Sequence, residues 1–100
     1  MMENTRIPWR DSSLKLLCKT GVLVVGGGLP GVCAAIASAR AGVPTMLVER
    51  SAQIGGQAGE INTWGLDGFI DPDGKLLMGG IPFEILQRTL AEGGSDPVLT

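Results

Sequence analysis

The stretch from Val22 to Glu49, VLVVGGGLPGVCAAIASARAGVPTMLVE, constrains the fold more than any other part of the sequence. Four apolar residues enter a cluster of glycines, an alanine-rich segment follows, and a second apolar run ends on a carboxylate. Strands covered on both faces of a sheet are apolar throughout, and small residues let a helix pack closely on them. The stretch therefore predicts a strand at Lys19–Val25, a helix at about Leu29–Ala41 and a second, parallel strand at Thr45–Val48.

The glycine cluster has the spacing G-x-G-x-x-G at Gly26, Gly28 and Gly31, with Gly27 as an additional glycine. In such a turn the first glycine allows the sharp exit from the strand, the second lets the backbone approach a pyrophosphate, and the third brings the helix close to the sheet. Pro30 suits the first turn of the helix, where a missing N–H costs least. The unpaired amides of this helix start favour a bound diphosphate.

Glu49 stands at the carboxyl end of the second predicted strand. A carboxylate there can accept hydrogen bonds from both hydroxyls of an adenosine ribose, and it repels the 2′-phosphate of NADP. The alternative is an ordinary surface glutamate. Because strand, glycines, helix, second strand and acid agree in order and spacing, we expect the adenosine diphosphate half of a dinucleotide to bind here.

Composition excludes several other classes of protein. The 100 residues carry a net charge of −2 with no block of like charge, so we expect neither a nucleic-acid partner nor a membrane surface. No apolar run approaches the roughly 20 residues that span a bilayer, and no secretory signal is recognisable at residues 1–19. We interpret Cys18 and Cys33 as isolated buried thiols, and a cytoplasmic setting follows.

The residues after Glu49 carry a family resemblance. The combination GGGLPG, LVER and IGGQ resembles the N-terminal FAD-binding segment of FAD-dependent oxidoreductases with the glutathione-reductase-type fold. The continuations GGQAGEINTWG and GGIPFEILQRTLAEGG are similar to relatives of fumarate reductase flavoproteins, and the resemblance covers about residues 20–95. It implies FAD as the cofactor and the following cofactor-binding residues: Gly26, Gly28, Leu29, Pro30, Gly31, Glu49, Arg50, Gly55, Gly56 and Gln57.

Residues 58–80 form a long glycine-rich connection, which is typical of a functional loop. The family resemblance implies that Thr63 and Trp64 lie toward the isoalloxazine ring. Asp71 and Asp73 lack the later acidic ligands of a calcium loop, so we expect a β-turn between strand-like pieces at 68–70 and 76–78, and no metal site.

Residues Ile81 to Glu92 predict a second long helix, which begins near a proline and ends at a glycine pair. Glu84 and Arg88 are four residues apart and can pair on its solvated side.

We therefore predict an α/β fold, a Rossmann-like βαβ FAD/NAD(P)-binding domain that is incomplete at the C-terminal side. Residues 1–19 are expected to form a leader, packed beside the first strand or partly disordered, with Trp9 on the domain surface. Residues 20–100 are expected to be the N-terminal portion of the FAD-binding domain.

The predicted function is binding of the ADP moiety of FAD at the front of a flavin-dependent oxidoreductase that acts on a small-molecule redox substrate. Catalytic residues are unknown, since the chain has no histidine and no tyrosine, and we expect these 100 residues to be inactive alone. Two alternatives stay open: an NAD-binding module, and a non-catalytic fragment or subunit completed by a partner chain that supplies the rest of the flavoprotein.

Overall fold

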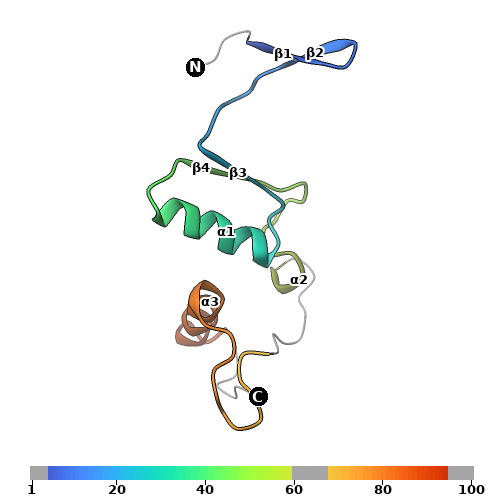
Figure 1. Ribbon diagram of the computed structural model, residues 1–100. Coiled ribbons are helices and arrows are strands. Elements are labelled where there is room, and N and C mark those ends of the chain that lie inside the picture. The colour runs from blue at the N-terminus through green and yellow to red at the C-terminus, as the bar shows by residue number, and fades with distance from the viewer. Residues whose placement is uncertain (1–4, 60–67, 95–100) are drawn as a thin grey trace.

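The computed structural model of the protein describes residues 5–59 and 68–94. Within these residues a short antiparallel hairpin, a parallel strand pair and three helices follow one another along the chain (Figure 1). Their bounds are β1 Arg6–Trp9, β2 Ser12–Lys15, β3 Val22–Val25, α1 Leu29–Arg40, β4 Thr45–Val48, α2 Gly56–Gly59 and α3 Gly80–Ala91.

The predicted βαβ unit is confirmed. Strands β3 and β4 are parallel and pair in register from Val22↔Thr45 to Val25↔Val48, with α1 as the connection between them. The second strand has the predicted bounds, and α1 ends one residue before the predicted Ala41. The α/β class follows from this small parallel sheet and its helices, as in part of a Rossmann-like FAD-binding domain.

Strand β3 starts later than predicted, at Val22 and not at Lys19. Opposite this point lies Pro44, which has no N–H to donate to a ladder. The Pro44 carbonyl accepts instead from the Thr20 hydroxyl at 2.7 Å and from the Val22 amide at 3.1 Å. Regular pairing therefore begins only at Val22.

Helix α1 covers one face of this sheet (Figure 1). The Thr45 hydroxyl donates to the Ser38 hydroxyl of α1 at 2.8 Å. At the start of the helix, a Cβ placed on Gly31 would lie 3.5 Å from Val24 Cγ1, which is ordinary packing distance. Alternate residues of both strands therefore point at α1, because successive side chains of a strand face opposite ways.

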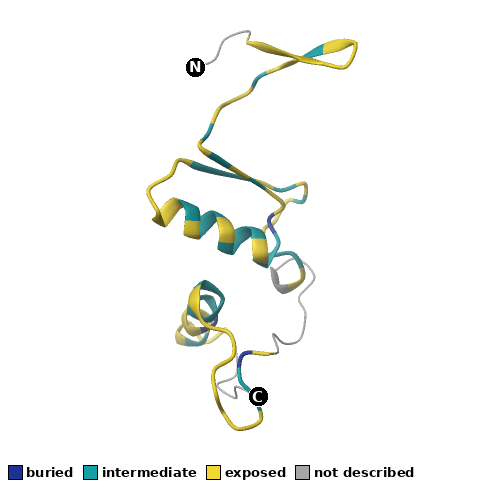
Figure 2. Ribbon diagram, viewed as in Figure 1, coloured by how far each residue is buried: buried dark blue, intermediate teal, exposed yellow. Residues whose placement is uncertain are grey.

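The other face of the sheet, which we call the open sheet face, carries Leu23, Val25, Met46 and Val48. Its residues Leu23, Val25 and Val48 are 55%, 78% and 41% exposed (Figure 2). Cys18 lies on this side, with its Sγ 3.4 Å from Met46 Sδ, and it is exposed. The prediction that Cys18 is buried is wrong, because no element of the described chain covers this face.

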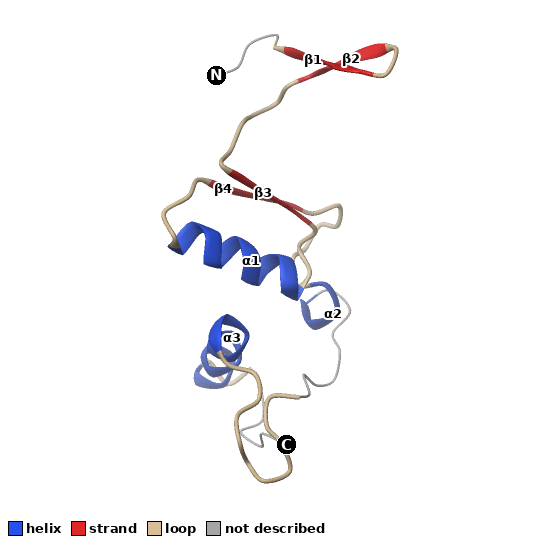
Figure 3. Ribbon diagram, in the orientation of Figure 1, coloured by secondary structure: helices blue, strands red, loops and turns tan. Residues whose placement is uncertain are grey.

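Residues 6–15 form a hairpin that stands apart from the other elements, and the expectation of an arm packed beside the first strand is wrong (Figure 3). Trp9 is 55% exposed and does not pack on the domain. The turn passes through Arg10 with a φ of 52°, whereas asparagine or glycine is usual in two-residue hairpin turns. Pro8 also argued against a strand. These two residues explain why the sequence did not indicate a hairpin.

The hairpin makes the molecule elongated. Its radius of gyration is 18.1 Å, whereas a compact domain of this length has about 13 Å. Among the described residues, Phe69 and Leu86 are the buried large apolar side chains, at 5% and 8% exposure.

Phe69 and Leu86 both lie in the C-terminal part of the chain, Leu86 on α3. Phe69 lies 6.4 Å from Phe83 of α3, centroid to centroid. The predicted β-turn is confirmed between Phe69 and Met78, with a bridge between Ile70 and Leu76. The Asp71 carboxylate accepts the amides of Asp73 and Lys75 within this turn, which is a structural role for that acid.

Helix α3 is shifted one residue toward the N-terminus from the predicted range. The predicted pair of Glu84 with Arg88 is present, at 2.9 Å. Glu84 is also bound by both terminal nitrogens of Arg40, at 2.7 and 2.8 Å, which joins α3 to the end of α1. The sequence had assigned Glu84 to a merely solvated face.

Thr63 and Trp64, predicted to lie near the isoalloxazine ring, fall outside the described residues. In the part of the chain that is described, every helix is too short or too polar to cross a membrane.

Candidate functional site

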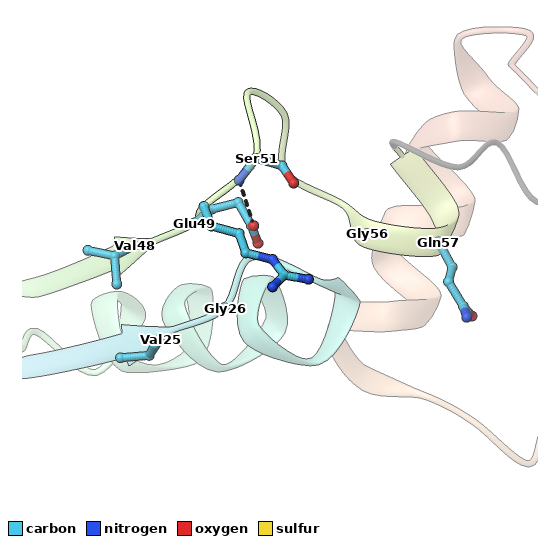
Figure 4. Close-up of a pocket in the computed structure, with 8 residues that line it drawn as sticks. Val25, Gly26, Val48, Glu49, Ser51, Gly56 and Gln57 are labelled. Carbon is cyan, nitrogen blue, oxygen red and sulfur yellow. Dashed lines mark hydrogen bonds between the residues drawn. The ribbon is translucent and has the colours of Figure 1, made fainter.

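An open pocket of about 630 Å³ lies at the carboxyl ends of β3 and β4 (Figure 4). In open parallel sheets, ligands bind at this end of the strands. Its walls come from the two strand ends, the loop after β4 and the start of α2. The lining residues are Val25, Gly26, Val48, Glu49, Arg50, Ser51, Gly56 and Gln57.

Glu49 is the acid of this pocket, and it is half-buried at the end of β4. Its Oε2 accepts the Gly27 amide at 2.6 Å and its Oε1 accepts the Ser51 amide at 2.9 Å (Figure 4 draws the second of these). The two amides, Ser51 first, hold the pKa of Glu49 below its ordinary value, and Arg50 contributes a smaller attraction. Glu49 is therefore ionised at neutral pH.

The turn out of β3 needs glycine at two positions for steric reasons. Gly26 has a φ of +106°, a region that side chains rarely adopt, and its amide donates to the Val48 carbonyl at 2.8 Å. A Cβ on Gly31 would overlap the carbonyl oxygen of Gly26. The sharp turn and the start of α1 are thus packed directly on one another.

Gly28 is different, because nothing in the described part of the chain requires a glycine there. Its φ and ψ of −67° and 176° suit any residue, and among the described residues an added Cβ would meet only Pro30 Cδ, at 3.8 Å. Gly28 is the N-cap of α1 and offers no side chain to the first amides of the helix, which have no intrahelical acceptor. The space beside Gly28 is open to a ligand atom.

The second glycine pair lies against the first glycine turn. Gly55 pairs with Gly28 in a parallel bridge, and the Gly55 amide donates to the Gly27 carbonyl at 2.7 Å. A Cβ on Gly56 would lie 3.1 Å from Gly28 Cα. The two loops therefore approach to backbone contact, and the missing side chain of Gly56 permits this approach.

The structure gathers the ten predicted site residues at one end of the sheet in two groups. Five of them line the pocket: Gly26, Glu49, Arg50, Gly56 and Gln57. The other five form the turn and helix start behind it: Gly28, Leu29, Pro30, Gly31 and Gly55.

Sequence reasoning missed four residues of the site: Val25, Val48, Ser51 and Gly27. The first three line the pocket, and Gly27 is buried between the loops. Ser51 had one available signal, its place two residues after the acid, where an amide can turn back to a carboxylate. No group of three or more His, Cys, Asp or Glu side chains is placed to hold a metal in residues 5–59 and 68–94.

A family model described as FAD dependent oxidoreductase matches residues 21–99. The chain belongs to the FAD dependent oxidoreductase family. The match spans the βαβ unit, both glycine loops and α3, and the family implies FAD as the cofactor. The resemblance recognised in the sequence is thereby confirmed. No curated protein and no solved structure matches the chain.

Proposed function

We propose that this chain binds the ADP moiety of FAD at the ends of β3 and β4, and that it forms the front of a flavin-dependent oxidoreductase. The observation that carries the proposal is Gly28. Within residues 5–59 and 68–94 its missing Cβ serves no contact or backbone conformation, and it leaves room at the uncapped start of α1. A diphosphate fits this position, because the amides and the partial positive charge of a helix start attract phosphate.

The remaining groups of the site suit the rest of the ADP moiety. Glu49 is ionised and borders the pocket beside the turn, where it can accept ribose hydroxyls and repel a 2′-phosphate. Gly55 and Gly56 contact the first glycine turn through backbone atoms, which lets an extended dinucleotide pass close to both loops. When bound, the flavin supplies the redox chemistry, exchanging a hydride or an electron pair with a small-molecule substrate.

A titration of the purified chain with FAD and with NAD tests the cofactor. We expect saturable quenching of flavin fluorescence by the chain, and no heat of binding with NAD in calorimetry. Saturable NAD binding without FAD binding would replace the proposal with the NAD-module alternative, which leaves the close approach of Gly55 to Gly28 without a purpose.

Gly28→Val separates the ligand role of this glycine from a structural role. Valine suits the local backbone, so we expect the circular dichroism and the unfolding midpoint to stay unchanged, while FAD affinity falls roughly 10- to 100-fold or is lost. Gly79→Val is the matched control: Gly79 is the N-cap of α3, with extended backbone and an added Cβ at least 3.9 Å from other atoms. FAD binding by Gly28→Val at wild-type affinity would contradict the proposal.

We further propose that a partner chain, or a further segment of the flavoprotein, covers the open sheet face. Parallel sheets occur almost only with both faces covered. Here α1 covers one face, whereas Leu23 and Val25 on the other are more than half exposed. Without that cover and the residues it brings, we expect the chain to turn over no substrate.

A further inference from the structure

Glu49 contacts two separate loops of the site. Its Oε2 accepts the amide of Gly27, in the turn after β3, and its Oε1 accepts the amide of Ser51, in the loop after β4. Each carboxylate oxygen therefore already accepts a hydrogen bond from a backbone amide of the protein itself. A surface glutamate at a strand end requires neither contact.

Both backbone polar groups of Gly27 are hydrogen-bonded to residues of the chain after β4. Its amide donates to Glu49, and its carbonyl accepts the Gly55 amide at 2.7 Å. A Cβ on Gly27 would lie 3.1 Å from Glu49 Cβ, from Glu49 Oε2 and from Ile54 Cγ2, closer than nine in ten real Cβ contacts. The packing around Gly27 thus leaves little freedom for the first turn to move relative to the second loop.

The contacts need the acceptor capacity of a carboxylate. An ionised carboxylate offers acceptor sites on both oxygens, about four in total, and carries no donor. Gly27 and Ser51 use two of the sites, the Arg50 backbone also acts on the carboxylate, and the capacity that remains can accept a ribose hydroxyl. A glutamine would present an NH₂ donor to one of the two backbone N–H groups and would lose that hydrogen bond.

We propose that Glu49 is a positioning residue that holds the glycine turn and the loop after β4 in their binding arrangement before FAD arrives. This inference rests on the proposed function, and it adds a second role to ribose binding. A site whose loops are already ordered avoids the cost of ordering them when the ligand binds. Glu49 then raises the affinity for FAD in part indirectly, because it keeps Gly27 and Ser51 in position.

The first experiment uses the chain without nucleotide and compares amide hydrogen exchange in the wild type, Glu49→Gln and the control Glu92→Gln. Glu92 lies at the C-cap of α3, away from the pocket. We expect at least one of the Gly27 and Ser51 amides to exchange about tenfold faster or more in Glu49→Gln, with α3 amides unchanged, and no change at either site in the control. Unchanged exchange at Gly27 and Ser51 would overturn the inference.

The second experiment measures affinity for FAD and for an FAD analogue whose adenosine ribose lacks both hydroxyls. A role through the ribose alone predicts that Glu49→Gln binds the analogue as tightly as the wild type does. The positioning role predicts a loss of about fivefold or more for both ligands. Equal affinity of wild type and variant for the analogue would overturn the inference.

Gly27→Ala is a second variant that tests the inference even if Glu49→Gln fails to fold. This variant keeps the carboxylate and presses a methyl group against Glu49 and Ile54. We expect faster exchange at Ser51 and weaker binding of both ligands, whereas unchanged exchange and binding would contradict the inference. If the wild type binds neither ligand, the proposed function fails, and the exchange experiment still decides the positioning role.

Discussion

At the scale of single residues, the glycines of the first turn differ in what they do. Gly26 is required by its backbone conformation, and Gly31 by its contact with the Gly26 carbonyl. Gly28 has neither constraint in the described part of the chain, and this is why we propose that its small size serves a ligand. The same three-glycine motif therefore combines two structural glycines with a third to which the proposed function assigns ligand binding.

We predict that Gly31→Ala lowers the free energy of unfolding by about 1–3 kcal/mol or more, because the new methyl group must push the Gly26 carbonyl or the start of α1 aside. Urea denaturation measures this change. Gly79→Ala is the control, since an added Cβ there lies 3.9 Å from its nearest neighbour, Leu76 Cδ2. Equal stability of the two variants would show that the turn relaxes without cost.

At the scale of elements, the contact between α1 and α3 includes an ion-pair group of Arg40, Glu84 and Arg88. Arg40 binds Glu84 through two nitrogens, and Arg88 adds a third contact. The Arg40 hydrogen bond, supported by the charges of both arginines, lowers the pKa of Glu84 from 4.5 to about 2. These side chains are partly exposed, so salt screens their attraction.

The stabilisation by Glu84 should depend on acid pH. A carboxyl group with a lowered folded-state pKa stabilises the fold fully above its unfolded value, here 4.5, and loses this effect as the pH falls toward about 2. We expect thermal stability, or exchange protection of α3 amides, to decline across this window, and less so in Glu84→Gln. Glu92→Gln is the control and should keep the wild-type profile. Parallel profiles for wild type and Glu84→Gln would contradict the prediction.

At the scale of the whole molecule, the two faces of the β3–β4 sheet differ in how they are covered. Helix α1 separates the β3–β4 sheet from α3, whereas no described helix or strand covers the other side of the sheet (Figure 1). Large exposed apolar patches mark interaction surfaces. The open sheet face is therefore the surface at which we expect the remaining layer of the flavoprotein.

Leu23→Lys tests this expectation. Leu23 is 55% exposed and does not line the pocket, so the free energy of unfolding of the chain alone should change by less than about 0.5 kcal/mol. Val24→Lys, on the side that faces α1, is the matched control and should destabilise the fold strongly. Equal destabilisation by both substitutions would show that the open sheet face is covered within this chain.

The order β3, α1, β4 and α3 was predictable from the sequence, because local signals determine these elements, whereas β1, β2 and α2 were not predicted. Strand β4 has its predicted bounds, and α1 and α3 lie within one residue of theirs. Apolar runs, alanine content, prolines and terminal glycines act over a few residues each. The hairpin of residues 6–15 lacked such signals, and Pro8 with Arg10 argued against it.

The contacts of Glu49 with Gly27, of Gly55 with Gly28 and of Arg40 with Glu84 were not predictable, since each joins residues that are more than 20 positions apart. A sequence pattern indicates that an acid and four glycines lie near one another, but not which amide meets which oxygen. That pairing depends on how the strand register and the tilt of α1 bring two loops together. The sequence by itself thus determined the family and the βαβ order, and the tertiary packing determined the site's internal hydrogen bonds and the open sheet face.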